Sequence, residues 1–219
     1  MININKLLYN VIFTDIIISF IIMIKPKIDK KGYIHFSDYP DFIPNLTPRQ
    51  IFEMGSFGGT YWRPITSSIT NKKYKNEHLK FPKKWWKNID DSMLISSKYN
   101  IEINKYKVFC GSSLEDWENS GWIKKYDPYG WVQWYCNFFL GRRGKSSEEI
   151  EYDKYQISRW IKLASEKGRF RKMLINKIIN NDTTFDDFSI SPSIRQTLQH
   201  WAYILTSEDV NREVNRKTK

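Results

Sequence analysis

The sequence predicts a mainly α-helical fold: a compact helical domain with an irregular, loop-rich N-terminal half and at most a short β element. Apolar residues recur at helical spacing through the C-terminal half, and Ser, Thr, Pro and Gly stand where helices begin and end. Hydrophobic residues make up 41% of the 219 positions, which is enough to bury a core. We expect an apolar leader at 1–22, a single globular domain at 23–206 and a charged tail at 207–219 that forms a frayed helix.

The N-terminal half contains few regular elements. Thr47 suits the N-cap of a helix, Pro48 its first turn and Gln50 the third position of a capping box, and Gly55 ends that short helix. A glycine-rich turn over 55–60 follows. The other elements expected in this half are a short strand over Tyr106–Phe109 and a capped helical turn over Ser113–Asn119.

Four helices are expected in the C-terminal half. The first carries aromatic residues at i, i+3, i+4, i+7 and i+8, which form one face: Trp131, Trp134, Tyr135, Phe138 and Phe139. Ser146 and Glu149 form a capping box for a longer second helix, which ends at Gly168. The third helix is expected over Phe170–Ile179. The fourth begins at Ser191-Pro192 and carries an apolar stripe at Ile194, Leu198, Trp201, Ala202 and Leu205.

The segment from Leu7 to Ile24 is largely apolar and is interrupted by Asn10 and Asp15. Three interpretations remain open: a membrane anchor, a buried helix, or upstream sequence in front of a true start at Met23. A central Asp costs about 2.5–3.5 kcal/mol in a membrane helix, which counts against the anchor. No small-residue cleavage site follows the run, which counts against a signal peptide. Membrane contact is therefore expected only if residues 7–24 are translated and inserted.

Cysteine and histidine are scarce. Cys110 and Cys136 lie 26 positions apart, and no pair among the cysteines and histidines has the spacing of zinc ligands. We therefore expect no metal and no cofactor. A cysteine-poor chain of this length is typical of an intracellular protein with reduced thiols, with one disulfide as the alternative. His200 adjoins Trp201 in an amphipathic helix, which favours a structural role.

The net charge of +11 is confined to two regions. Residues 72–87 hold seven Lys and one acidic residue, and residues 141–180 hold eleven Lys or Arg and five acidic residues. Such regions attract phosphate backbones, so DNA or RNA is the expected partner. The alternative is a solvated surface that only keeps the protein soluble.

Nucleic-acid contact is expected at a basic helical hairpin formed by the second and third helices, whose spacing resembles a helix–turn–helix. Arginines beside the N–H groups of a helix N-terminus make an anion site. The candidates for phosphate contact are Arg142, Arg143, Arg169, Arg171 and Lys172. Trp85 and Trp86, next to Lys84, are candidates for stacking on exposed bases. The alternative is that these tryptophans fasten an irregular loop to the helices.

An enzyme is the second hypothesis, with a pocket between the loop at 55–65 and the turn at 127–131. Arg63 and the acidic residues Glu115 and Asp116 would be its polar groups. The acids lie on the polar side of a short helix, however, which favours simple solvent exposure. A structural or protein-interaction domain is the third hypothesis.

The loop glycines of functional interest are Gly55, Gly58 and Gly59. A phosphate cradle is one interpretation, but the loop lacks the Lys-Ser/Thr ending of a Walker motif and follows a helix rather than a strand. The favoured interpretation is that these glycines permit a positive φ or close backbone packing.

Several longer strings resemble an uncharacterised family of proteins found in large (giant) DNA viruses, fungi and other eukaryotes. They are Leu46-Thr47-Pro48, the run from Gly55 to Ile65, the run from Asp127 to Cys136, Gly141-Arg142-Arg143, Gln156 to Trp160, and Ser191 to Thr197. The resemblance spans roughly residues 33–206. It implies a domain that starts after residue 23 and a viral or eukaryotic intracellular setting, and it implies no activity.

Overall fold

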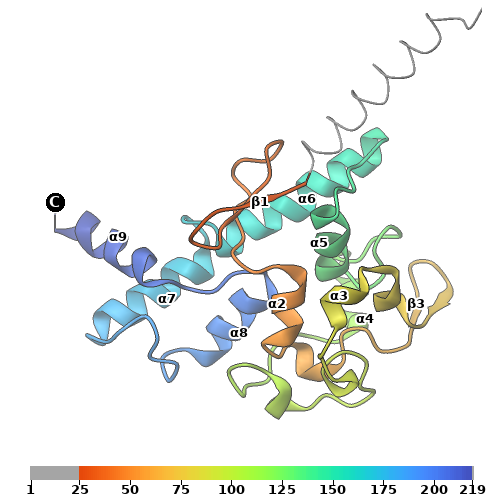
Figure 1. Ribbon diagram of the computed structural model, residues 1–219, viewed down its shortest axis with the longest axis horizontal. Helices are drawn as coiled ribbons and strands as arrows, with labels where there is room; N and C mark the ends of the chain where they lie inside the picture. Colours follow the sequence, from red (N-terminus) through yellow and green to blue (C-terminus); the bar gives the residue numbers. More distant parts are fainter. Residues whose placement is uncertain (1–24, 219) are drawn as a thin grey trace, which may run out of the picture.

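The computed structural model describes residues 25–218, where helices dominate and the strands form two short antiparallel pairs (Figure 1). This agrees with the mainly α-helical prediction. The run Leu7–Ile24, with its alternatives of anchor, leader or buried helix, lies outside the described residues. Between residues 25 and 218, no helix combines the length and the apolar character that crossing a membrane requires.

Both strand pairs belong to the N-terminal half. They are β1 (Lys27–Ile28) with β2 (Ile34–His35), and β3 (Ile65–Ser67) with β4 (Lys72–Tyr74). The sequence predicted at most one such element and placed it elsewhere.

The strand expected over Tyr106–Phe109 is wrong, because this segment is a loop. Two of its backbone groups bond to side chains instead of to a neighbouring strand. Tyr106 N donates to Gln196 Oε1, and Val108 O accepts from Asn104 Nδ2. Side-chain partners of this kind leave no sequence periodicity, so the apolar pattern alone was misleading.

The expected helix starts at Thr47 and Ser146 are confirmed. α2 (Pro48–Glu53) follows Thr47, whose capping box is completed by Gln50. α6 (Ser147–Ala164) follows Ser146, with Glu149 in the same role. Each box satisfies backbone N–H groups that a first helical turn leaves unbonded.

Short helical turns connect α2 to α5 (Trp131–Phe139). In chain order they are η1 (Phe57–Gly59), η2 (Glu77–Lys80), α3 (Lys83–Trp86), η3 (Asp91–Met93), η4 (Ile101–Ile103) and α4 (Leu114–Asn119). One of them is tied to the second hairpin by a carboxylate: Glu118 of α4 accepts hydrogen bonds from Ser67 Oγ and from Ser68 N and Oγ. The loop-rich N-terminal half is therefore held by specific polar contacts.

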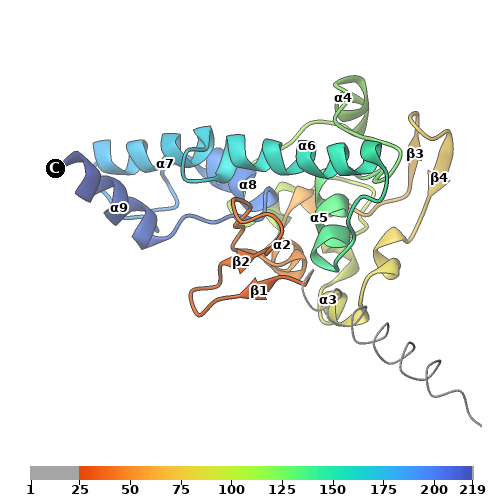
Figure 2. The same cartoon turned by 90° about the horizontal axis from the view of Figure 1, so that it is seen from above.

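α6 and α7 (Arg169–Asn180) follow one another along the length of the molecule (Figure 2). Both views show α7 continuing in the direction of α6 instead of folding back on it, so the expected helical hairpin is wrong. The helices of a helix–turn–helix module cross at a large angle, which this pair does not do. The basic residues of 72–87 lie on and between β4 and α3, at the opposite end of the molecule from α7.

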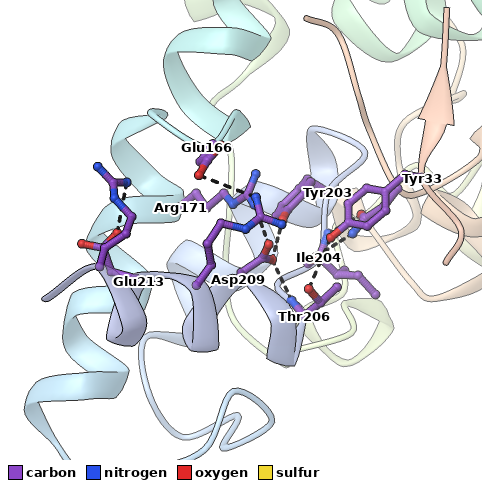
Figure 3. Close-up of polar contacts among 11 residues, drawn as sticks. Tyr33, Glu166, Arg171, Tyr203, Ile204, Thr206, Asp209 and Glu213 are labelled. Carbon is purple, nitrogen blue, oxygen red and sulfur yellow. Dashed lines mark hydrogen bonds and ion pairs between the residues drawn. The ribbon is translucent and has the colours of Figure 1, made fainter. Parts of the chain in front are cut away.

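The C-terminal segment that was expected to be a charged tail forms α9 (Ser207–Lys217) and packs against α7 (Figure 1). Arg171 of α7 and Asp209 of α9 form a buried ion pair (Figure 3). Lys31 also pairs with Glu208, which links this end of the chain to the β1–β2 hairpin. α9 therefore belongs to the folded body.

Aromatic side chains fill the core, as the helical stripes predicted. The ring of Phe42 lies 5.1–5.9 Å, between centroids, from four aromatic rings on α5 and α6: Trp134, Tyr135, Phe138 and Trp160. Trp62, one of the tryptophans in irregular surroundings, is also fully buried. Most of the tryptophans are thus structural, and those left at the surface are the candidates for contact with a ligand.

Candidate ligand pocket

Two arginines that were expected to contact phosphate are engaged in structural pairs. Arg142 bonds through its guanidinium to both carboxylate oxygens of Asp127, which is fully buried. Burial raises the pKa of Asp127, while Arg142 acts in the opposite direction. Arg143 bonds to Asp38 and lies over the ring of Phe138, 3.5 Å from its centroid. These two arginines fix the end of α5, which corrects their assignment to a phosphate surface.

The three remaining basic candidates on α7 differ in whether their side chains are buried or exposed. Arg171 is 7% exposed and bonds to Asp209, so it too is structural. Lys172 is exposed beside the α7–α9 contact. Arg169 is exposed at the first turn of α7 and, unlike the others, lines the largest cavity described below.

Trp85 and Trp86 are not open for base stacking, which corrects that expectation and favours a structural role. Trp85 is 6% exposed and its ring stacks on Phe81. Trp86 donates from Nε1 to His78 O. Both side chains fasten the lysine-rich stretch to the body, whereas the neighbouring Lys84 side chain is exposed.

The glycines of the glycine-rich loop allow the backbone to pack closely against neighbouring segments. Gly55, Gly58 and Gly59 all have positive φ, and a Cβ at Gly59 would lie 2.0 Å from Ser92 O. The loop amides are already used, since Gly58 N donates to Asn104 Oδ1 and Gly59 N to Ser56 O. The interpretation as close backbone packing is confirmed, and these two amides are not available to a phosphate.

The polar face of α8 (Pro192–His200) holds this loop in place. Phe57 N donates to His200 Nε2, and Gln196 Nε2 lies 3.0 Å from the same nitrogen. Gln199 Nε2 donates to Ile51 O at the end of α2. These contacts set the position of Phe57, whose ring stacks on His200 at 3.8 Å.

A cavity of about 810 Å³ opens between this loop and the turn at 127–131, where the enzyme hypothesis placed one. We call it the Arg159 pocket. Its volume falls in the range of small-molecule sites. Aromatic rings from six parts of the chain line it: Phe57 and Tyr61, Trp117 and Trp122, Tyr129 and Trp131, Tyr155, Phe170, and Trp201.

Arg159 of α6 has unusual surroundings. Its guanidinium carbon lies 5.2 Å from the ring centroid of Trp122, 5.7 Å from Tyr155 and 5.0 Å from Trp201. It donates a hydrogen bond to the neutral Gln156 Oε1, and no carboxylate of the described residues lies within ion-pair distance. Burial lowers the pKa of Arg159, because desolvation penalises the charge.

Two further cations, Lys162 and Arg169, line the Arg159 pocket, and no Asp or Glu of the described residues does. Arg169 begins α7, whose N-cap Gly168 provides no side-chain acceptor for the first-turn amides. A helix N-terminus carries partial positive charge, so it adds to the field of the two cations. The pocket is thus aromatic and uniformly positive.

The acids, the histidine and the cysteine that the sequence drew attention to either lie outside this pocket or are unreactive. Glu115 and Asp116 are exposed on α4 and do not line the Arg159 pocket. Burial lowers the pKa of His200 to about 3, so its ring is neutral, and the Phe57 N–H occupies Nε2. Burial raises the pKa of the Cys110 thiol. Glu115, Asp116, His200 and Cys110 are therefore not placed or protonated for general acid–base or thiolate catalysis in this pocket.

A smaller cavity of about 270 Å³ adjoins the first, and we call it the Arg63 pocket. Arg63 and Phe109 belong to it alone, whereas other side chains face both pockets, including Tyr61, Trp117 and Tyr129. The Arg63 Nη1 atom donates to Thr60 O. Phe109 is 64% exposed and packs on Tyr99, with 4.8 Å between the ring centroids.

Arg63 and Arg169 were candidates from the sequence, but Arg159 was missed. One signal was available: Tyr155, Arg159 and Lys162 stand at i, i+4 and i+7 of the second expected helix, which places an aromatic ring and two cations on one face. Cys110 and Cys136 are both free thiols, so the alternative of one disulfide between them is wrong.

No protein-family model, curated protein or solved structure matches this chain.

Proposed function

We propose that this protein binds nucleic acid by taking a nucleotide unit, an aromatic base with its phosphate, into the Arg159 pocket. The unpaired, partly buried guanidinium of Arg159 carries the proposal. A cation removed from water is costly unless an anion accompanies it, and the described residues supply none. A bound anion would complete this charge balance.

The rest of the lining suits a base. Aromatic side chains stack on any of the bases, and stacking tolerates sequence differences because every base has a π face. Trp122, which is 41% exposed, and Trp201 both lie beside the Arg159 guanidinium in the pocket wall and offer such faces. Lys162 and Arg169 are then placed to meet phosphate oxygens.

Binding of a nucleoside monophosphate tests the proposal, with calorimetry on the full-length protein. The monophosphate should bind more tightly than either the uncharged nucleoside or inorganic phosphate, because only it offers both a ring and an anion. Arg159→Met should weaken monophosphate binding by about tenfold or more, since hydrogen bonds to charged groups contribute about 1.5–3 kcal/mol.

Arg212→Met is the matched control. It removes the same charge from an exposed residue of α9 that does not line the Arg159 pocket, and it should leave the affinity unchanged. Arg159→Met should also leave thermal stability unchanged or raise it, because no carboxylate loses its partner. Absence of monophosphate binding at millimolar concentration, or equal affinity in the Arg159→Met variant, would overturn the proposal.

A further inference from the structure

The Arg63 pocket has the same two kinds of side chain as the Arg159 pocket. Arg63 is partly exposed, with no carboxylate of the described residues within ion-pair distance, and its guanidinium bonds to a backbone carbonyl. Phe109 offers an aromatic face beside it. As in the larger pocket, no Asp or Glu of the described residues lines the cavity.

Phe109 is held in this exposed position by an ordered loop. Its ring packs on Tyr99, whose hydroxyl accepts from Asn104 Nδ2 and from Cys110 N. Tyr99 in turn covers Gly58, where a Cβ would meet the Tyr99 ring at 2.5 Å. An exposed phenylalanine on such a fixed support is preorganised for contact, which reduces the entropy lost on binding.

The two pockets adjoin and share part of their walls. Tyr61, Trp117 and Tyr129 face both of them, as do residues 110–112. The shared hydroxyl groups are fixed, since Tyr61 donates to Tyr129 O and Tyr129 donates to Arg63 O. Arg63 and Phe109 therefore lie on the far side of a wall that the Arg159 pocket shares.

We infer that the Arg63 pocket is a second subsite that takes the neighbouring nucleotide, so that the ligand is a single-stranded oligonucleotide. This inference rests on the proposed function and specifies its ligand. Each subsite pairs an arginine with aromatic rings, the combination that holds one nucleotide of a strand. A duplex keeps its bases stacked and paired, so it cannot insert them into either pocket.

The test compares a nucleoside monophosphate, single-stranded hexanucleotides of DNA and RNA, and a DNA duplex, all with the full-length protein. The single strands should bind more tightly than the monophosphate, and the duplex more weakly than the single strands. The two hexanucleotides show whether deoxyribose or ribose is preferred.

Two variants isolate the second subsite. Phe109→Ala should lower hexanucleotide affinity by about fivefold or more, because a stacked base loses its aromatic partner. Arg63→Met should lower it by about tenfold or more, because a phosphate loses a charged hydrogen-bond donor. Monophosphate affinity should stay unchanged, because neither side chain lines the Arg159 pocket. The control is Leu79→Ala, which removes an apolar side chain of equal exposure, 64%, outside both pockets.

The outcomes separate the two proposals. If the monophosphate does not bind, the proposed function itself fails. If it binds in an Arg159-dependent way but the hexanucleotides gain nothing from Phe109 and Arg63, the second subsite is overturned and the proposed function stands. Equal affinity for duplex and single strand also overturns the second subsite.

Discussion

Arg171 of α7 and Asp209 of α9 form an ion pair that is closed to solvent, with side-chain exposures of 8% and 0% (Figure 3). The carboxylate is fully satisfied: Tyr203 Oη and Thr206 N both donate to its second oxygen. This pair joins the C-terminal helix to the helix whose first turn borders the Arg159 pocket.

Breaking this pair should be costly. Arg171→Ala should lower the free energy of unfolding by about 3–5 kcal/mol, because it leaves the carboxylate of Asp209 buried without its counter-ion. Arg212→Ala is the control, since Arg212 pairs with Glu166 at 3.6 Å and both are about half exposed. That change should cost less than about 1 kcal/mol. Urea unfolding measures both, and equal losses would contradict the structural role of Arg171.

Acid should destabilise the fold through His200. Its folded pKa of about 3 lies below the reference value of 6.5, so the native state excludes the proton that the unfolded chain accepts. Above about pH 6.5, protonation of His200 does not affect the free energy of unfolding. Below that pH, the free energy of unfolding falls by about 1.4 kcal/mol per pH unit until the folded pKa is reached. His200→Gln should flatten this slope between pH 6 and pH 4, roughly one proton's worth, in urea unfolding. An unchanged slope would show that other groups control the acid limb.

Substitutions at two glycines should distinguish the cost of a strained backbone conformation from the cost of a steric clash. Gly32 has φ +88° and open space, with no atom within 4 Å of where a Cβ would stand, whereas a Cβ at Gly59 would meet Ser92 O at 2.0 Å. Gly32→Ala should therefore cost about 1–2 kcal/mol, from the left-handed conformation alone. Gly59→Ala should cost clearly more, because the Ser92 backbone must also move. Thermal unfolding distinguishes them, and equal losses would mean that the loop relaxes freely.

Cys110 should report on occupancy of the pockets. It lines both of them, whereas Cys136 is fully buried, so an alkylating reagent should label Cys110 first. A bound nucleoside monophosphate should slow that labelling. Because burial raises the thiol pKa above 9.0, the labelling rate of the free protein should still be rising at pH 9.0. Mass spectrometry of the labelled peptide follows the reaction. An equal labelling rate with and without the nucleoside monophosphate would show that the ligand binds elsewhere.

Local signals in the sequence predicted much of the secondary structure. The capping boxes at Thr47 and Ser146 and the aromatic stripe of α5 depend on residues a few positions apart, and all three are confirmed. The direction of α7 relative to α6 depends on the backbone of the short turn around Gly168, which composition does not specify. The hairpin was therefore the wrong choice between two geometries with the same sequence pattern.

The candidate site was less accessible to prediction because charge alone does not show whether a side chain has a partner. Arg142 and Arg171 stand in a basic region of the sequence, yet each meets a buried carboxylate from a distant part of the chain, Asp127 or Asp209. Arg159 lies in the same region and meets no carboxylate of the described residues. Only the three-dimensional arrangement separates a structural arginine from one that is open to a ligand.

Because the Arg171–Asp209 ion pair holds α9 against α7, proteases should cleave α9 only when this contact breaks and the helix detaches. Asp209 is the buried residue of this 11-residue helix, and a helix that short is marginal on its own in water. Once detached, α9 melts and exposes the peptide bonds after Arg212 and Arg216 to trypsin. The rate at which trypsin cleaves after these residues therefore measures how often the contact between α9 and the first turn of α7 opens.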